Sequence, residues 1–300
     1  MSQHFLPTGK PVVGHRRSYG EMPYEERFGV GVVGLHEGRT MLVALLESGL
    51  CRSVAACDSN PDKCSEVEKL CPEVEYYNNF GEMLKRDDIQ IVAIYTPDSF
   101  HSHHIEMAMR MGKHVICTKP LINDPAEIPR LLQVQKETGM RLQVGQSTRF
   151  YEPFQRQRED FEAGKFGEVE VLDAHYNHRM DWYYAKSPWT ISETHWAYLG
   201  LSHPVDLVRW YLGEIEEVHA YGTRTTLGTE YGMKTPDAIV VNLKSKSGRI
   251  GRVLGNYGIH ELGKARSMIE CLLMGSKGTS LACYPDLNYT YHDDNGIEIE

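Results

Sequence analysis

Residues 28–39 read FGVGVVGLHEGR, a short apolar run rich in valine and glycine that leads into a polar turn. The part at residues 30–34 has the length and β-branched content of a buried strand. Residues 40–49 then carry apolar side chains at helical spacing. A strand, a glycine turn and a helix in this order predict the first unit of a βαβ fold.

The same alternation continues along the chain. Further strands are predicted at residues 53–57, 89–95, 114–117 and 141–144, and helices at residues 104–111 and 126–138. Strands that are apolar throughout are typical of a parallel sheet with both faces covered. We therefore predict an α/β Rossmann domain with a parallel, doubly wound sheet at residues 28–148.

The pattern changes after about residue 150, where helices become fewer and strands longer. Strands are predicted at residues 168–175, 217–223, 238–244, 250–256 and 268–274, with one helix at residues 204–212. Ser247-Gly248 is a hairpin signal between two of these strands. We predict an α+β domain with an open, mostly antiparallel sheet at residues 149–300. Residues 1–27 form a polar N-terminal extension, expected to be an irregular arm.

Composition limits the class of protein. A chain of 300 residues exceeds one ordinary core, which agrees with two domains. A net charge of -9 without a long basic run argues against nucleic-acid binding. No apolar stretch is long enough to span a membrane, and no secretory signal is evident. Seven scattered cysteines without a C-x-x-C pair suggest reduced thiols, so we expect a cytoplasmic protein.

Two glycine patterns compete as the dinucleotide-binding loop. The string at residues 29–34 satisfies G-x-G-x-x-G but occupies the strand, whereas a phosphate-binding loop must follow it. Residues 34–39 stand at the strand-to-helix turn, although His36 replaces the second glycine. An ordinary βα turn is the alternative. The predicted cofactor contacts in this loop are Gly34, Leu35, His36, Glu37, Gly38 and Arg39.

Asp58 ends the second predicted strand, at the distance from the loop where an acidic residue binds the adenosine ribose hydroxyls. A carboxylate there repels a 2′-phosphate, so NAD is favoured over NADP. The alternative is that Asp58 only caps the following helix.

Thr96, Pro97 and His101 follow the strand at residues 89–95, on the edge where open α/β sheets bind ligands. His101, His103 and His104 suggest zinc, but no partner has the spacing of a metal site, so no metal is expected.

Lys119 precedes Pro120, and proline keeps the residue before it extended, so the lysine is held at a strand tip facing the crevice. Its amine could donate or relay a proton. His203 precedes Pro204 at a helix start, where the positive helix end favours a neutral imidazole. Asp206 could orient that ring or cap the helix. Local features leave a surface lysine and a helix-start histidine as the alternatives.

These residues together resemble the Gfo/Idh/MocA oxidoreductase family, named for glucose-fructose oxidoreductase and inositol dehydrogenase. The resemblance rests on an ordered set of motifs between residues 28 and 275. They are VAIYTP at residues 92–97, His101, GKHV at 112–115, Lys119-Pro120, GQSTR at 145–149, GKFGE at 164–168 and HPVDLVRW at 203–210.

The resemblance implies an NAD(P)-dependent oxidoreductase acting on a secondary hydroxyl of a sugar, sugar derivative or cyclitol. Lys119 matches the catalytic lysine of the family and His203 its substrate-facing histidine, with Thr118 and Gln146 beside the cofactor. The open sheet commonly forms the subunit interface, which implies a homo-oligomer, a dimer or a tetramer. The expected substrate-binding residues are Arg149, Tyr176, His178, Arg179, Trp189, His195, His203 and Asp206.

Three departures from the family pattern leave alternatives open. Thr118 stands where a glutamate usually precedes the lysine, and Leu199 where an aspartate usually stands four residues before the histidine. Asp181, Glu193 and Asp206 are unranked candidates to replace that aspartate. The chain also stops at Glu300, where relatives continue into helices, so we expect either a short protein or an incomplete chain.

Two other functions therefore stay open. One is an NAD-retaining enzyme that uses transient oxidation for elimination, epimerisation or glycoside cleavage. The other is a non-catalytic NAD- or sugar-sensing regulator.

Overall fold

The computed structural model describes residues 22–260 and 266–299. The predicted arm at residues 1–27 lies mostly outside the described residues, and its described end holds the short 3-10 helix η1 (Tyr24–Glu26). No helix of the described chain is both long and apolar enough to cross a membrane.

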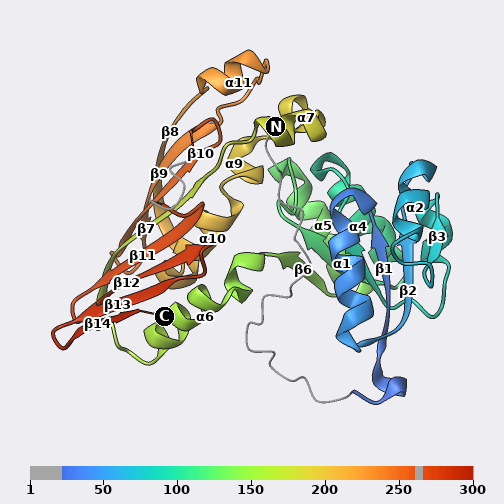
Figure 1. Cartoon of the computed structure of the whole chain (residues 1–300), viewed down its shortest axis with the longest axis horizontal. Coiled ribbons are helices and arrows are strands. Elements are labelled where there is room, and N and C mark those ends of the chain that lie inside the picture. Colours follow the sequence, from blue (N-terminus) through green and yellow to red (C-terminus); the bar gives the residue numbers. More distant parts are fainter. Residues whose placement is uncertain (1–21, 261–265, 300) are drawn as a thin grey trace.

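The N-terminal domain is a six-stranded parallel sheet in the order β3-β2-β1-β4-β5-β6, which confirms the predicted Rossmann domain (Figure 1). Its strands are β1 (Phe28–Val33), β2 (Cys51–Cys57), β3 (Glu75–Tyr77), β4 (Ile91–Ile94), β5 (His114–Thr118) and β6 (Leu142–Gly145). Its helices are α1 (Leu35–Ser48), α2 (Pro61–Glu68), α3 (Phe80–Leu84), α4 (His101–Arg110) and α5 (Ile128–Thr138). The strand order reverses between β1 and β4, and ligands bind at such a switch point.

The turn after β1 is tighter than the sequence predicts. Gly34 takes φ +88°, and a Cβ there would lie 2.5 Å from the carbonyl carbon of Tyr95. One residue therefore reverses the chain, and α1 begins at Leu35 instead of residue 40. His36 and Glu37 consequently lie in the first turn of the helix and not in a loop.

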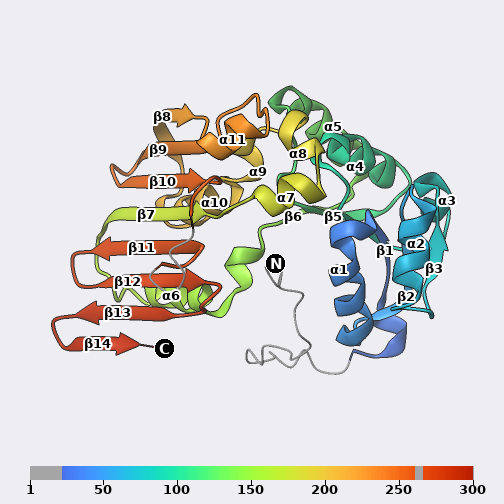
Figure 2. The ribbon, with the colours of Figure 1, turned by 45° about the horizontal axis from the view of Figure 1, so that its top comes forward.

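The C-terminal domain is an eight-stranded mixed sheet in the order β14-β13-β12-β11-β7-β10-β9-β8 (Figure 2). Its strands are β7 (Val169–Asn177), β8 (Ile215–Thr223), β9 (Ala238–Ser245), β10 (Ile250–Asn256), β11 (Ile269–Gly275), β12 (Thr279–Tyr284), β13 (Tyr289–Asp293) and β14 (Gly296–Ile299). All described pairs are antiparallel except β7–β10, which confirms an open, mostly antiparallel sheet.

Two helices, α6 (Glu152–Glu162) and α10 (Ser202–Leu212), cover one face of this sheet. The other described helices of the domain are α7 (Asp181–Lys186), α8 (Trp189–Ser192), α9 (Trp196–Leu199) and α11 (Thr226–Glu230). Of these, only α10 is predicted from the sequence. Figure 1 shows α6 and α10 on the face that looks toward the Rossmann domain, where Leu207 and Val208 are fully buried against the sheet. No described helix covers the opposite face.

Candidate active site

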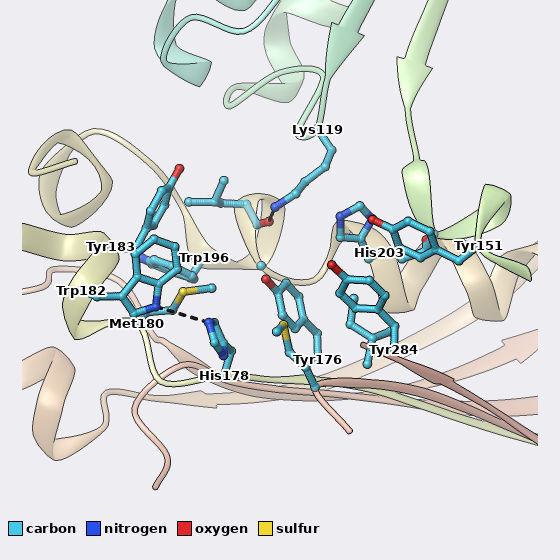
Figure 3. Close-up of a pocket in the computed structure, with 15 residues that line it drawn as sticks. Lys119, Tyr151, Tyr176, His178, Met180, Trp182, Tyr183, Trp196, His203 and Tyr284 are labelled. Carbon is cyan, nitrogen blue, oxygen red and sulfur yellow. Dashed lines mark hydrogen bonds between the residues drawn. The ribbon is translucent and has the colours of Figure 1, made fainter. Parts of the chain in front are cut away.

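A cavity of about 280 Å³ lies where the two domains meet, and Lys119 reaches it from the end of β5 (Figure 3). Its other walls come from the segment after β6, from the ends of β7, β11 and β12, and from α7, α9 and α10. The lining residues are Lys119, Thr148, Tyr151, Tyr176, His178, Met180, Trp182, Tyr183, Trp196, Leu199, Gly200, His203, Met268, Ile269 and Tyr284.

Lys119 is held at the cavity by the backbone of the second domain. Its Nζ donates a hydrogen bond of 2.8 Å to the carbonyl oxygen of Leu199. Burial lowers the pKa of the Lys119 amine to about 8, although the carboxylates of Asp98 and Glu37 oppose that change. The amine can therefore exchange a proton near neutral pH.

His203 lies on the same cavity, in the first turn of α10. The helix begins at Ser202 with Leu201 as its N-cap, so His203 lies near the predicted helix start, as the second helical residue. The side chain is buried, and burial together with the nearby Lys119 lowers the pKa of His203 to about 3. The imidazole is therefore neutral at physiological pH, and its Nδ1 has no hydrogen-bond partner among the described residues.

Asp206 does not orient His203 in this structure. Both of its carboxylate oxygens accept from Arg149, at 2.5 and 2.7 Å, and the Arg149 guanidinium lies 4.9 Å from the centre of the Trp210 ring. Neither Arg149 nor Asp206 lines the cavity. This bidentate pair instead joins the segment after β6 to α10.

Three tyrosines surround the two candidate catalytic residues. Figure 3 shows the hydroxyl groups of Tyr151, Tyr176 and Tyr284 directed toward the space between Lys119 and His203. Tyr151 and Tyr284 are stacked with their ring centres 4.5 Å apart. Burial raises the pKa of Tyr284 to about 12, so its phenol stays protonated and can donate a hydrogen bond.

The other end of the cavity is mostly aromatic. Trp182, Tyr183 and Trp196 line it together with His178. Trp182 Nε1 donates to His178 Nε2 at 3.3 Å, which leaves the proton of a neutral His178 on Nδ1. Aromatic faces beside hydrogen-bonding groups suit a ring-shaped substrate that is apolar on one face.

The remaining predicted substrate residues lie away from the cavity lining. Arg179 forms an ion pair of 2.8 Å with Asp181, and His195 is exposed. Trp189 begins α8 and is half-buried. Of the predicted set, Tyr176, His178 and His203 line the cavity.

The edge of the Rossmann sheet brings the predicted cofactor residues together. Asp58 is half-buried, and its carboxylate accepts from the backbone N–H groups of Leu35 (2.8 Å) and Asn60 (2.9 Å). It therefore fixes the start of α1 to the end of β2, while the N-cap of α2 is Asn60. Gly38 serves helix–strand packing, because a Cβ there would lie 2.9 Å from Val32.

The first turn of α1 carries its own charges. The Glu37 carboxylate accepts a 2.8 Å ion pair from Lys186 of α7, so the pair bridges the two domains. Arg39 lies 3.5 Å from Glu66, and burial together with the charge of Lys186 lowers the pKa of His36. The first backbone N–H groups of this helix have no intrahelical acceptor, and that of Leu35 donates to Asp58.

His101 fastens the two loops beside β4 and β5. Its Nε2 lies 2.8 Å from the carbonyl oxygen of Thr96 and its Nδ1 lies 2.7 Å from that of Pro120. The Thr96 hydroxyl lies 3.0 Å from Nδ1 of His104. Both ring nitrogens of His101 are thus engaged by the backbone, and the structure places this residue as a support for the crevice.

The three remaining predicted cofactor residues are Pro97, Thr118 and Gln146, and each lies at or just after the end of a strand of the Rossmann sheet. Pro97 precedes the short 3-10 helix η2 (Asp98–Phe100), and Thr118 ends β5, half-buried. Gln146 follows β6, and its Oε1 is buried without a hydrogen-bond partner among the described residues. No group of three His, Cys, Asp or Glu side chains able to hold a metal occurs in the described chain.

Comparisons with known proteins follow the two domains. The model of the oxidoreductase family with an NAD-binding Rossmann fold, GFO/IDH/MocA, matches residues 28–146. The GFO/IDH/MocA C-terminal domain model matches residues 154–280.

Individual relatives share a third or less of their aligned residues with this chain. The chain is 31% identical over 144 residues to 1-carboxy-3-chloro-3,4-dihydroxycyclohexa-1,5-diene dehydrogenase of Comamonas testosteroni, which spans 48% of this chain but only 36% of that protein. It is 26% identical over 257 residues to inositol 2-dehydrogenase of Salmonella typhimurium, spanning 83% of this chain and 70% of that protein. An oxidoreductase from Agrobacterium radiobacter, solved with NAD+, L-tartaric acid and magnesium, shares the fold with a TM-score of 0.81 at 18% identity, over 91% of this chain and 79% of that one.

Proposed function

Since this chain belongs to the GFO/IDH/MocA family of NAD-binding oxidoreductases, we propose that it oxidises or reduces a secondary hydroxyl of a sugar, sugar derivative or cyclitol, with Lys119 and His203 handling the hydroxyl proton. The related inositol 2-dehydrogenase and dihydroxycyclohexadiene dehydrogenase support this class, because their names describe hydroxyl groups on six-membered rings.

One observation carries the proposal: Lys119 and His203 meet on one cavity, and burial gives them different protonation states. Near pH 8 the amine of Lys119 can accept or return the hydroxyl proton. The neutral imidazole of His203 can accept a hydrogen bond from the same hydroxyl and so hold its orientation. The phenols of Tyr151 and Tyr284 can donate to neighbouring hydroxyls.

The cofactor is proposed to lie along the carboxyl edge of the Rossmann sheet. The start of α1 would hold the pyrophosphate, and Asp58 the adenosine ribose, which favours NAD because its carboxylate repels a 2′-phosphate. The unpartnered Oε1 of Gln146 suits an amide or hydroxyl donor at the nicotinamide end. Bound there, NAD supplies the hydride acceptor or donor that the side chains lack.

The uncovered face of the C-terminal sheet is proposed to join two or more copies of the chain. Tyr221 and Val240 are opposite each other in the β8–β9 register and are 71% and 38% exposed, and Val240 is opposite Leu254 on β10. Ile297 and Ile299 on the edge strand are also exposed. A row of apolar side chains on an open sheet is typical of a subunit interface.

The test is a spectrophotometric assay of NADH formation, with NAD or NADP and a panel of sugars, sugar acids, cyclitols and cyclic diols. We expect turnover with NAD on at least one ring substrate. Lys119→Met should lower kcat/KM by about 10²–10⁴-fold while leaving NAD affinity within a few-fold, because it removes the proton-transfer group together with its single hydrogen bond to the Leu199 carbonyl. Lys113→Met is the matched control, since that lysine is bonded to backbone carbonyls of Arg86 and Ile89 far from the cavity. Tight NAD binding without turnover on the whole panel would contradict the proposal.

A further inference from the structure

A carboxylate is buried beside the active site without lining it. Asp98 is only 3% exposed and begins η2, directly after the Thr96-Pro97 turn. The hydroxyl of Thr194 donates to its Oδ2, whereas Oδ1 has no hydrogen-bond partner among the described residues. An incompletely satisfied buried carboxylate costs stability, so a compensating role is expected.

The topology brings Asp98 to the same sheet edge as Lys119. Strands β4 and β5 are neighbours with Ile94 opposite Cys117, so the residues that follow each strand lie on adjoining loops. The His101 side chain contacts a carbonyl of each loop and fixes their separation. The charges of Asp98 and the Lys119 amine act on each other, although the two groups make no direct ion pair and the amine donates to the Leu199 carbonyl.

Asp98 is the only buried carboxylate among the described residues that act on the Lys119 amine. The carboxylates that act on Lys119 are Asp98 and Glu37, but Glu37 is half-exposed and paired with Lys186. His203 faces Lys119 as a neutral ring. No carboxylate occurs among the described residues that line the cavity, and Asp181, Glu193 and Asp206 are absent from them.

We propose that Asp98 is the buried counter-ion of Lys119, carried by this chain in place of a carboxylate at Leu199. The inference rests on the proposed function of Lys119 as the proton-handling group. Asp98 is a positioning residue, because it acts through Lys119 and does not line the cavity. Its negative charge supports the ammonium form that burial disfavours, and the Leu199 carbonyl directs that ammonium into the cavity.

Groups around Asp98 partly offset the burial that raises its pKa. Burial raises its pKa, while Thr194, His101, the Ser99 N–H and Lys119 act in the opposite direction. Tyr183 also lies within electrostatic range, and the Asp98 charge helps to raise the pKa of that phenol. The carboxylate therefore has the Thr194 hydroxyl as a donor and the Lys119 ammonium as the cation that acts on it.

The experiment measures the Lys119 pKa directly, without any substrate. The folded protein is labelled with a trace of acetic anhydride across pH 6–11, and mass spectrometry gives the rate at the Lys119 peptide, which follows the deprotonated fraction. Asp98→Asn and Asp98→Ser remove the charge. Thr194→Val keeps the charge and removes the hydrogen bond. Glu37→Gln removes the other carboxylate that acts on the Lys119 amine, one that is half-exposed and paired with Lys186.

We expect both Asp98 variants to lower the Lys119 midpoint by about one pH unit, Glu37→Gln to lower it less, and Thr194→Val to leave it in place. An unchanged midpoint in folded Asp98→Asn protein, or an equal change in Thr194→Val, would overturn the proposal. In the second case, the hydrogen bond between Thr194 and Asp98, and not the Asp98 charge, would determine the pKa of Lys119. If the midpoint moves but no variant or wild-type protein turns over any substrate, the counter-ion assignment stands and the proposed function fails.

Discussion

The Nζ atom of Lys119 donates a hydrogen bond to the backbone carbonyl oxygen of Leu199, 2.8 Å away, and thereby joins the two domains at the cavity. A backbone acceptor does not depend on the side chain at position 199. The Leu199 side chain is instead buried with Trp196 and Tyr257 in an aromatic cluster. Leu199 therefore has two independent roles. Its side chain packs in the cluster, and its carbonyl oxygen orients Lys119.

The first prediction uses that independence. Leu199→Ala should lower the free energy of unfolding by about 2–4 kcal/mol, because it removes a buried side chain from a packed cluster. The Lys119 midpoint in the acetic anhydride labelling should stay close to that of the wild type. Urea denaturation measures the stability, and Leu132→Ala, at a 60% exposed position, is the control. A large change in the labelling midpoint would show that packing of the Leu199 side chain, and not its carbonyl, determines the pKa of Lys119.

The second prediction concerns the pH dependence of oxidation. Lys119 must be deprotonated to accept the hydroxyl proton, so kcat/KM should rise with pH and level off above about pH 8. No further change is expected near pH 6.5, because the pKa of His203 is lowered to about 3. A stopped-flow or steady-state profile from pH 5 to 10 measures this. A profile centred near 6.5 would instead assign the titrating group to a histidine.

The third prediction concerns acid stability. His203 stays neutral in the folded protein down to about pH 3, whereas in the unfolded chain it takes up a proton near 6.5. The unfolded state therefore binds more protons between these values, and stability is lost as the pH falls from 6.5 toward 3. Between pH 6.5 and 5 this loss amounts to at most about 2 kcal/mol.

His203→Gln should remove that share of the acid sensitivity, since glutamine does not titrate. Urea denaturation at pH 7 and pH 5 gives the difference for each protein. His195→Gln, at an exposed position, is the control and should keep the wild-type difference. Equal differences in wild type and His203→Gln would contradict the buried neutral ring.

The sequence was sufficient to predict the features that depend on local order along the chain. Lys119 and Asp58 each directly follow a strand, and parallel strands place their ends on one edge, so their location follows from the βαβ pattern. The start of α1 was predicted too late, because His36 and Glu37 are polar and hide the first helical turn.

Features made by distant segments could not be predicted. Tyr284 joins Tyr151 only because β12 and the segment after β6 meet at one end of the second domain. The helix α6 escaped prediction because its buried face carries Gln157 and Asp160 in place of apolar residues. The Gln157 amide donates to Cys271 and Ser280, and Asp160 accepts from the Tyr289 hydroxyl at 2.7 Å. Those partners lie more than a hundred residues further along the chain.

The fourth prediction concerns the first turn of α1. Glu37 places a carboxylate at the helix start where the family is expected to bind pyrophosphate, and Lys186 balances it. Glu37→Gln should tighten NAD binding about 2–5-fold, because it removes a repulsive charge and frees Lys186 for the phosphates. Isothermal titration calorimetry with NAD measures the Kd. Glu82→Gln, an exposed carboxylate in α3, is the control; weaker binding in Glu37→Gln would mean that the Glu37–Lys186 pair itself holds the domains in the binding arrangement.

The fifth prediction concerns the uncovered face of the C-terminal sheet. If copies of the chain associate there, a charge at Val240 must be desolvated in the interface, and Val240→Asp should shift the protein toward the monomer by at least about tenfold in dissociation constant. Size-exclusion chromatography with light scattering, over a range of concentrations, measures the change. Leu70→Asp places the same charge at a 65% exposed position on the Rossmann domain and should leave the assembly intact. A monomeric wild type, or an assembly that survives Val240→Asp, would move the interface away from this face.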